Sequence, residues 1–270
     1  MAARKKTSKS KQRTRGGAAA VRVSSRVTRA HYSAAGLEHI AHRILKLSEA
    51  DETEVEIDSS VDALTRFANN TIHQNVAEQT LVISVRANVD GRTARATTNK
   101  TDEESLRRVA AAAVRLARNE PKNPDLLPML KRQKYQPVNR FYAATVAATP
   151  EARAKAVARV CKMADANKQT AAGIFSTGFA QSLLVNSKGL LARYEHTDSE
   201  FSITILEEKS SGWAKANSPN VADIDPDALA RSASHKAAAS REPRELKPGH
   251  YTAILEPSAA LDLVGSLFFD

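Results

Sequence analysis

The sequence lacks the features of secreted and membrane proteins. Its 270 residues include one cysteine, Cys161, so no internal disulfide is possible, and this scarcity fits a reducing compartment. No apolar run approaches the ~20 residues that a helix needs to span a bilayer. The absences exclude a transmembrane helix and a disulfide framework, and a cytoplasmic location is the default expectation.

Common catalytic motifs are missing too. The chain contains no H-E-x-x-H, P-loop, C-x-x-C or G-x-S-x-G motif. Glu38, His39 and His42 could share a metal on one helix, but no third ligand stands nearby and their polar side of the helix favours a solvated face. Cys161 lies on an apolar helical stripe and is expected to be an ordinary buried cysteine.

Acidic residues are missing from the start of the chain, because the first is Glu38. The ten Lys and Arg residues before it account for the whole net charge of +10, so the remaining chain is neutral. Residues 1–31 are therefore predicted to be a disordered basic tail. A solubilising extension is the simplest interpretation of this tail, and nonspecific contact with nucleic-acid phosphates is the alternative.

The first part of the body has the pattern of an α+β domain over residues 32–120. Ser33 is placed to cap a helix with apolar residues on a 3.6-residue period. Alternating strands follow, with turns predicted at Asn69-Asn70 and Asp90-Gly91. Thr101 and Glu104 form a possible capping box for the next helix. The predicted fold class is α+β, with antiparallel sheets covered by helices.

A second set of elements predicts a central α+β domain over residues 121–246. Residues 121–148 are rich in proline and indicate an irregular connection. Thr149-Pro150 then begins a helix, and a second strand set and another helix follow. A strand over 251–255 and an apolar helix over 259–269 predict that residues 247–270 begin an incomplete β-rich carboxy-terminal domain. The apolar helix would need cover from further chain or a partner.

Four stretches of the sequence stand out together: Thr65 to Asn75, Asn186 to Leu190, Ser211 to Ala214, and Pro248 to Pro257. In sequence, order and separation they resemble the TldD/PmbA family, and the resemblance covers roughly residues 35–270. The resemblance implies two paralogous subunit types that pair. One type holds zinc through H-E-x-x-x-H plus a further ligand, and the implied substrates are unfolded or short peptides.

The zinc motif is where the sequence departs from the metal-bearing type. Alignment on the resemblance places Gly265, Ser266 and Asp270 at the motif positions, and no histidine follows His250. The chain therefore resembles the zinc-lacking PmbA type, also called TldE. We expect no catalytic residue, metal or cofactor in this chain, with zinc in a TldD-type partner. Arg66, Asn70 and His73 are the candidate substrate contacts, and an edge strand could bind peptide by β-addition. The alternative is a hairpin turn with a solvated arginine at Arg66 and Asn70, and a surface histidine at His73.

Three functional hypotheses follow. The first is a non-catalytic subunit, or fragment of one, in a TldD-type peptidase that acts on peptides. The second is a nucleic-acid-associated protein acting through its tail, and deletion of residues 1–31 would distinguish it from the first. The third is an inactive truncated product, which would aggregate through the apolar surface at 259–269.

Overall fold

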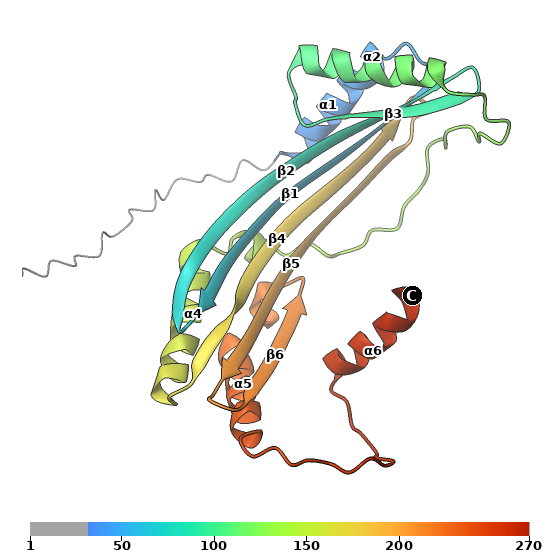
Figure 1. The fold of residues 1–270 in the computed structure, drawn as a ribbon. Coiled ribbons are helices and arrows are strands. Elements are labelled where there is room, and N and C mark those ends of the chain that lie inside the picture. The colour runs from blue at the N-terminus through green and yellow to red at the C-terminus, as the bar shows by residue number, and fades with distance from the viewer. Residues whose placement is uncertain (1–31, 270) are drawn as a thin grey trace, which may run out of the picture. The chain divides into compact units, whose positions relative to one another are not determined.

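The computed structural model describes residues 32–269 and has the predicted α+β fold class. The predicted basic tail, residues 1–31, lies outside the described residues, as does Asp270. Helices and strands alternate in blocks along the chain, with helices packed on an antiparallel sheet (Figure 1).

One six-stranded antiparallel sheet organises the molecule, in the order β3-β2-β1-β4-β5-β6. The strands are β1 (Glu52–Ala68), β2 (Thr71–Val89), β3 (Arg92–Thr98), β4 (Thr170–Asn186), β5 (Leu191–Leu206) and β6 (Ser211–Ser218). The two predicted strand sets are joined side by side, because β1 pairs with β4 from Glu54↔Asn186 to Phe67↔Gly173. A single sheet therefore runs through both predicted α+β segments.

The strands are longer than the sequence pattern predicts. The sequence pattern predicts four short strands over 173–179, 181–186, 190–197 and 199–207, but β4 continues through Ala180 and β5 continues through Asp198. The predicted turns are confirmed. Asn69 and Asn70 adopt left-handed φ angles of 50° and 58° between β1 and β2, and Asp90-Gly91 joins β2 to β3. Local turn chemistry was therefore easier to predict than strand length.

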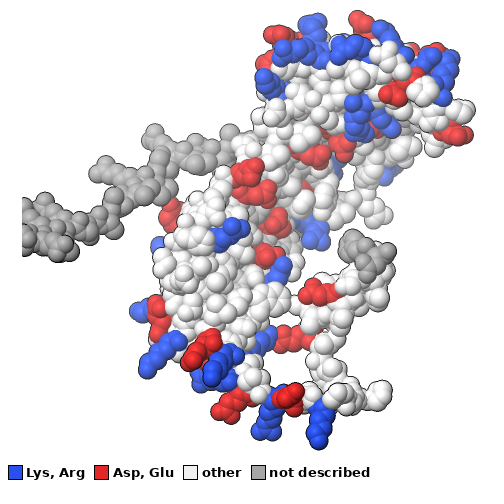
Figure 2. Space-filling view, in the orientation of Figure 1, with Lys and Arg blue, Asp and Glu red and all other residues white. Residues whose placement is uncertain are grey.

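Four of the longer helices begin with a side-chain cap. The helices are α1 (Ala34–Leu47), α2 (Glu103–Asn119), α3 (Ala143–Val146), α4 (Pro150–Ala166), α5 (Pro226–Ala239) and α6 (Pro257–Phe269), with a 3-10 turn η1 (Val221–Asp223). Ser33 and Thr149 cap α1 and α4, as predicted. The predicted cap of α2 was wrong: the side chain of Asp102, not Thr101, accepts a hydrogen bond from the Ser105 N–H at 2.9 Å. Lys and Arg side chains crowd the end of the molecule that carries α1 and α2 (Figure 2).

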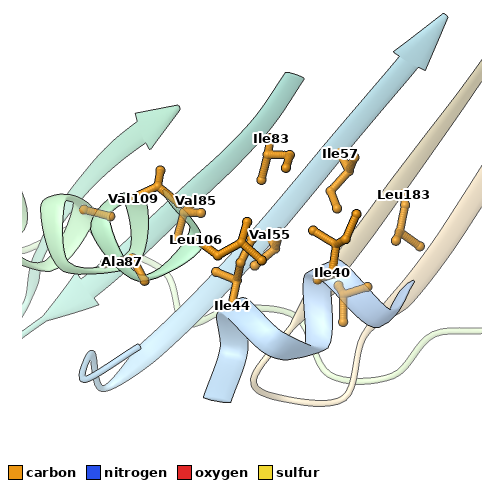
Figure 3. Close-up of a cluster of buried hydrophobic side chains, with 14 of the residues drawn as sticks. Ile40, Ile44, Val55, Ile57, Ile83, Val85, Ala87, Leu106, Val109 and Leu183 are labelled. Carbon is orange, nitrogen blue, oxygen red and sulfur yellow. The ribbon is translucent and has the colours of Figure 1, made fainter. Parts of the chain in front are cut away.

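The first core lies between α1, α2 and one end of the sheet. Its buried members are all aliphatic, and Ile44, Val55, Ile57, Ile83 and Val85 are fully enclosed (Figure 3). They come from α1, β1 and β2, and α2 adds Leu106 and Val109 from above β2. Burial of each such side chain contributes about 1.5–3 kcal/mol, so this end is held by aliphatic packing.

The second core lies under α4 and α5, at the other end of the same sheet face. Three phenylalanines meet there: the rings of Phe67 and Phe201 stack at 6.1 Å between centroids, and Phe175 meets Phe201 edge-on at 5.5 Å. Cys161 is buried in this cluster, as the sequence predicted. Gly212 allows α5 to approach β6, because a Cβ there would collide with the Ala233 carbonyl.

On the opposite face of the sheet, residues 32–269 place no helix pair. Along β1, every second residue from Thr53 to Phe67 is buried, whereas the alternating residues are exposed or half-buried. The predicted strand over 251–255 is wrong, since this segment is irregular. The predicted helix after it is α6, whose Leu267 and Phe268 are 81% and 79% exposed. Among the described residues, no helix is long and apolar enough to cross a membrane.

Candidate functional site

The three predicted substrate contacts lie together at the end of the β1–β2 hairpin. Arg66 is on β1 and is exposed, and its guanidinium donates a hydrogen bond to Gln74 on β2 at 3.3 Å. His73 is exposed at the register shift beside this pair, where the partners change from Arg66↔Gln74 to Phe67↔Ile72. Asn70 occupies the turn itself. The three residues therefore meet at the hairpin end, and they span eight positions of the sequence.

Asn70 differs from the other two because its side chain is fully engaged within the chain. Its amide nitrogen donates to the carboxylate of Asp165 at 2.5 Å and to the Gln169 carbonyl at 2.9 Å. Its amide oxygen accepts the N–H of Ala171 at 2.6 Å. These bonds tie the turn to the connection between α4 and β4. Asn70 therefore holds the hairpin in place, while Arg66 and His73 face solvent.

A row of carboxylates crosses the middle of the uncovered sheet face. Glu78 lies opposite Asp62 in the β1–β2 register, and Asp62 lies opposite Gly178, which in turn lies opposite Asp198 on β5. In Figure 2, acidic side chains appear along the middle of the molecule. Neither Asp62, Glu78 nor Asp198 belongs to an ion pair within residues 32–269.

Asp198 on β5 lies directly opposite Gly178, where β4 has no side chain. A Cβ at Gly178 would collide with the Asp198 carboxylate, so the glycine lets that carboxylate lie toward Asp62. Burial against the sheet raises the pKa of Asp198, the charge of Asp62 raises it further, and His196 opposes the shift. Protonation of Asp198 is therefore favoured in this row compared with an isolated aspartate.

The sequence analysis did not single out Asp62, Asp198 or Gly178. One signal was available: a glycine inside a strand often marks close approach of another group. The partner could not be inferred, because the β4–β5 register that puts Asp198 beside Gly178 depends on pairing over the whole length of both strands.

A cavity of about 470 Å³ lies beside the outer part of β5. The segment 135–138 and the start of α1 line it on one side, and Gln181, Arg193 and Tyr194 line it on the other. The backbone of Thr197 donates to the Arg140 carbonyl at 2.9 Å, which holds this segment along β5. The cavity mixes aromatic, amide and charged groups and has a size typical of small-ligand sites.

The residues at the predicted zinc-motif positions do not suit zinc. Gly265 has no side-chain donor, and Ser266 is a hydroxyl whose Oγ donates to the Asp262 carbonyl at 3.1 Å within α6. Zinc prefers thiolate, imidazole and carboxylate ligands. The third position, Asp270, is outside the described residues. Within residues 32–269, no group of three or more His, Cys, Asp or Glu side chains is arranged to hold a metal.

Two family models match the chain in succession. The model described as PmbA/TldA metallopeptidase domain 1 matches residues 53–117, and the PmbA/TldA metallopeptidase central domain matches residues 143–241. The first covers β1 to α2 and the second covers α3 to α5, so the matches include most of both cores, whereas α1 lies outside them. No curated protein matches the sequence.

Solved structures share the fold at low sequence identity. TldE from Thermococcus kodakarensis aligns at 16% identity and a TM-score of 0.63, over 75% of this chain and 47% of that one. Two proteins named for a suggested role as modulators of DNA gyrase also align. The Bacteroides thetaiotaomicron protein has 15% identity and a TM-score of 0.73, over 88% of this chain and 57% of that one. The Thermotoga maritima protein has 12% identity and a TM-score of 0.65, over 79% of this chain and 50% of that one.

The chain spans about half the length of the solved structures that it matches. At these identities the likeness shows the fold alone.

Proposed function

The chain belongs to the TldD/PmbA family of metallopeptidases, and from this premise we propose that it is the non-catalytic subunit of a two-component peptidase. A zinc-bearing paralogue of the TldD type would hold the metal. The substrates would be unfolded or short peptides. The pair of family domains, matched in order along the chain, is the observation that carries this proposal.

The chemistry of the α6 segment supports the non-catalytic role. The resemblance puts a zinc ligand at Gly265 and the base at Ser266, and neither residue can serve in that capacity. A subunit with this segment can contribute to binding, positioning and enclosure, while hydrolysis is left to the paralogue.

The uncovered sheet face is the surface that we assign to peptide contact. Arg66 lies on this face, and His73 lies at its margin, where both side chains are free to meet a bound segment. Asn70 supports them indirectly, because it fixes the turn between their strands. Arg66 and His73 are therefore proposed to contact substrate, and Asn70 to act as a positioning residue.

The test is reconstitution of this chain with the zinc-bearing paralogue from the same source. Zinc content and cleavage of an unstructured peptide are measured on each chain alone and on the copurified complex. We expect zinc to follow the paralogue and cleavage to require both chains. Zinc bound by this chain alone, or full activity of the paralogue without it, would refute the assignment.

Substitution of Arg66 sharpens the test. Arg66→Ala is expected to raise the KM of the reconstituted complex several-fold while kcat changes little, because the residue contacts peptide without touching the reacting atoms. Arg115→Ala is the matched control, since Arg115 is an exposed arginine on α2 outside the uncovered face. Equal effects of the two substitutions would remove Arg66 from the substrate surface.

A further inference from the structure

The outer edge of β5 is paired along only part of its length. β6 pairs with it from Ser199 onward. Before that point, the one backbone hydrogen bond on this side within the described part of the chain runs from the Thr197 N–H to the Arg140 carbonyl, at 2.9 Å. This bond belongs to an isolated parallel bridge between Arg140 and His196. We call residues 191–195, which have no strand on their outer side in the described chain, the β5 edge.

The β5 edge directs backbone groups away from the sheet. The Thr197 N–H points outward to Arg140, and backbone groups alternate between the two sides of a strand, so the N–H and C=O groups of Arg193 and Glu195 also point outward. Among residues 32–269, no hydrogen bond reaches these four groups. The β5 edge therefore offers two donors and two acceptors at the spacing of a strand, and such groups pair readily with another extended chain.

The segment 131–139 runs past the β5 edge without pairing with it. Its two ends are held, because the Asn186 side chain donates to the Leu130 carbonyl at 2.8 Å and the Arg140 carbonyl accepts the bond from Thr197. Between these anchors every residue is exposed, and no hydrogen bond joins the segment to the sheet within the described chain. We call residues 131–139 the strap. In Figure 1 the strap belongs to the long light-green loop between α2 and α4.

Two cavities flank the β5 edge, one on each face of the sheet. The cavity of about 470 Å³ lies on the face that carries the helices, where Leu37 of α1 and Leu183 of β4 line it. A second cavity of about 300 Å³ lies on the uncovered face, where Leu184 and Ala192 line it. Both cavities are also lined by the strap and by the β5 edge, and the residues common to both include Tyr135, Gln136, Val138, Arg193 and Tyr194.

We propose that an extended peptide binds along the β5 edge, between the edge and the strap, with consecutive side chains entering the two cavities in turn. This inference rests on the proposed function for the class of substrate, and it deepens that function by adding a contact outside the β1–β2 hairpin. The backbone of the peptide would bond to the outward groups of Arg193 and Glu195. Because side chains of an extended chain alternate between the two faces, each cavity would receive every second side chain.

The lining of the two cavities identifies the side chains that the peptide should carry. Tyr135, Val138 and Tyr194 line both cavities and are 55%, 61% and 40% exposed. With the leucines on either face, they give the cavities largely apolar walls, which favour apolar side chains. A compact small molecule in one cavity would leave the outward backbone groups of the β5 edge without partners. A peptide with consecutive apolar residues satisfies the backbone groups and fills both cavities.

The experiment measures peptide binding by the full chain with no paralogue present. The probe is a fluorescein-labelled peptide with three consecutive leucines at its centre and serine, lysine and glycine elsewhere, and binding is followed by fluorescence anisotropy. The control peptide has serines in place of the leucines. We expect the leucine peptide to bind roughly tenfold more tightly or better, because burial of apolar surface favours it.

A pair of substitutions at Glu195 isolates the backbone contact. Glu195→Pro removes the outward N–H, whereas Glu195→Ala removes the same side chain and keeps that N–H. Proline is tolerated on a strand where its missing N–H faces away from the sheet, so the β4–β5 pairing should persist, and circular dichroism checks this. The Pro variant should bind the leucine peptide roughly tenfold more weakly than the Ala variant.

Two neighbouring alanines on α1 test the larger cavity. Ala34 lines it, so Ala34→Trp should fill part of the cavity and weaken binding of the leucine peptide roughly tenfold. Ala35→Trp is the matched control, because Ala35 is exposed on the same helix turn and does not line the cavity. Its affinity for the peptide should match that of the unmodified chain.

Equal binding by the Pro and Ala variants of Glu195, or equal affinity for the leucine and serine peptides, would overturn the inference. Self-association of the chain that competes with the peptide would also overturn it and assign the edge to a second copy. The proposed function fails separately. Binding that depends on the Glu195 N–H, with no cleavage by the reconstituted complex, would refute that function and keep this inference. Cleavage that is the same for both Glu195 variants would refute this inference alone.

Discussion

The two halves of β2 belong to one continuous strand but have different surroundings. Residues 81–89 form the covered half: they pair with β1 as far as Asn88 and with β3 from Ile83 onward, and α2 covers one face. The open edge, His73–Thr80, pairs with β1 alone and is exposed. In the covered half, Leu81, Ile83, Val85 and Ala87 are buried at every second position. The open edge has no such row.

This difference separates stability from availability for binding. In the covered half, every second side chain is buried in the aliphatic core. The covered half therefore contributes to the stability of the fold. The open edge needs only its bonds to β1 and the anchored turn at Asn70. On its outer side, no strand of residues 32–269 pairs with it.

The largest effect is expected from truncation inside the covered half. Ile83→Ala should lower the free energy of unfolding by about 2–5 kcal/mol, because Ile83 is fully buried and its loss leaves a cavity. Val76→Ala on the open edge should change it by less than about 0.5 kcal/mol. Urea unfolding measured at low chain concentration checks both. Equal losses would mean that the two halves are equally part of the core.

The anchor of the open edge should give the next effect. Asn70→Ala removes three hydrogen bonds and leaves the Ala171 N–H without its side-chain partner, which should cost about 1–3 kcal/mol. Asn69→Ala is the matched control, because Asn69 has a similar left-handed φ. The difference between the two variants in thermal unfolding isolates the side-chain bonds. Indistinguishable variants would contradict the anchoring role.

The cap of the covering helix offers a smaller effect. Asp102→Ala removes the acceptor for the Ser105 N–H at the start of α2 and should cost about 1 kcal/mol. Glu104→Ala, at an exposed site in the first turn, should cost less. Denaturant unfolding of both variants decides whether Asp102, rather than the sequence-predicted Thr101 and Glu104, stabilises the helix.

Acid should weaken the covered half through Glu52, which lies opposite Asn88 at the end of β2. Burial raises the pKa of Glu52, but hydrogen bonds from the Met129 N–H, Lys188 and Asn88 outweigh it, so the pKa is lowered overall. Its stabilising contribution is therefore complete above the ordinary pKa of about 4.3 and is lost as the pH falls through the lowered value.

The Glu52→Gln variant tests this dependence. Its deficit in stability against the unmodified chain should be present near neutral pH and should shrink as the pH falls below about 4.3. Glu78→Gln, which removes an exposed carboxylate from the open edge, is the control substitution. A deficit that stays constant down to low pH would show that Glu52 acts through packing rather than charge.

Much of this architecture could be predicted from local patterns. The alternation around Val55 and Ile57, the turns at Asn69-Asn70 and Asp90-Gly91, and the Thr149-Pro150 helix start depend on neighbouring residues only. The β1–β4 pairing could not be predicted from local patterns, because it joins residues more than a hundred positions apart. Gly178 and Ala180 weaken the strand pattern of β4 locally, and only pairing on both sides keeps that strand continuous.

The candidate site was predicted in part. Arg66, Asn70 and His73 were named through a resemblance, and the structure brings them to one hairpin end. The internal role of Asn70 could not be read from the sequence, because Asp165, Gln169 and Ala171 come from the connection between α4 and β4. The row through Asp62 and Asp198 depends on strand register in the same way.

Amide hydrogen exchange of the full chain tests the division of β2 most directly. Peptides from the open edge should exchange faster than peptides from residues 81–89, because the open edge pairs with β1 alone and is exposed. Equal protection of both halves would contradict the account.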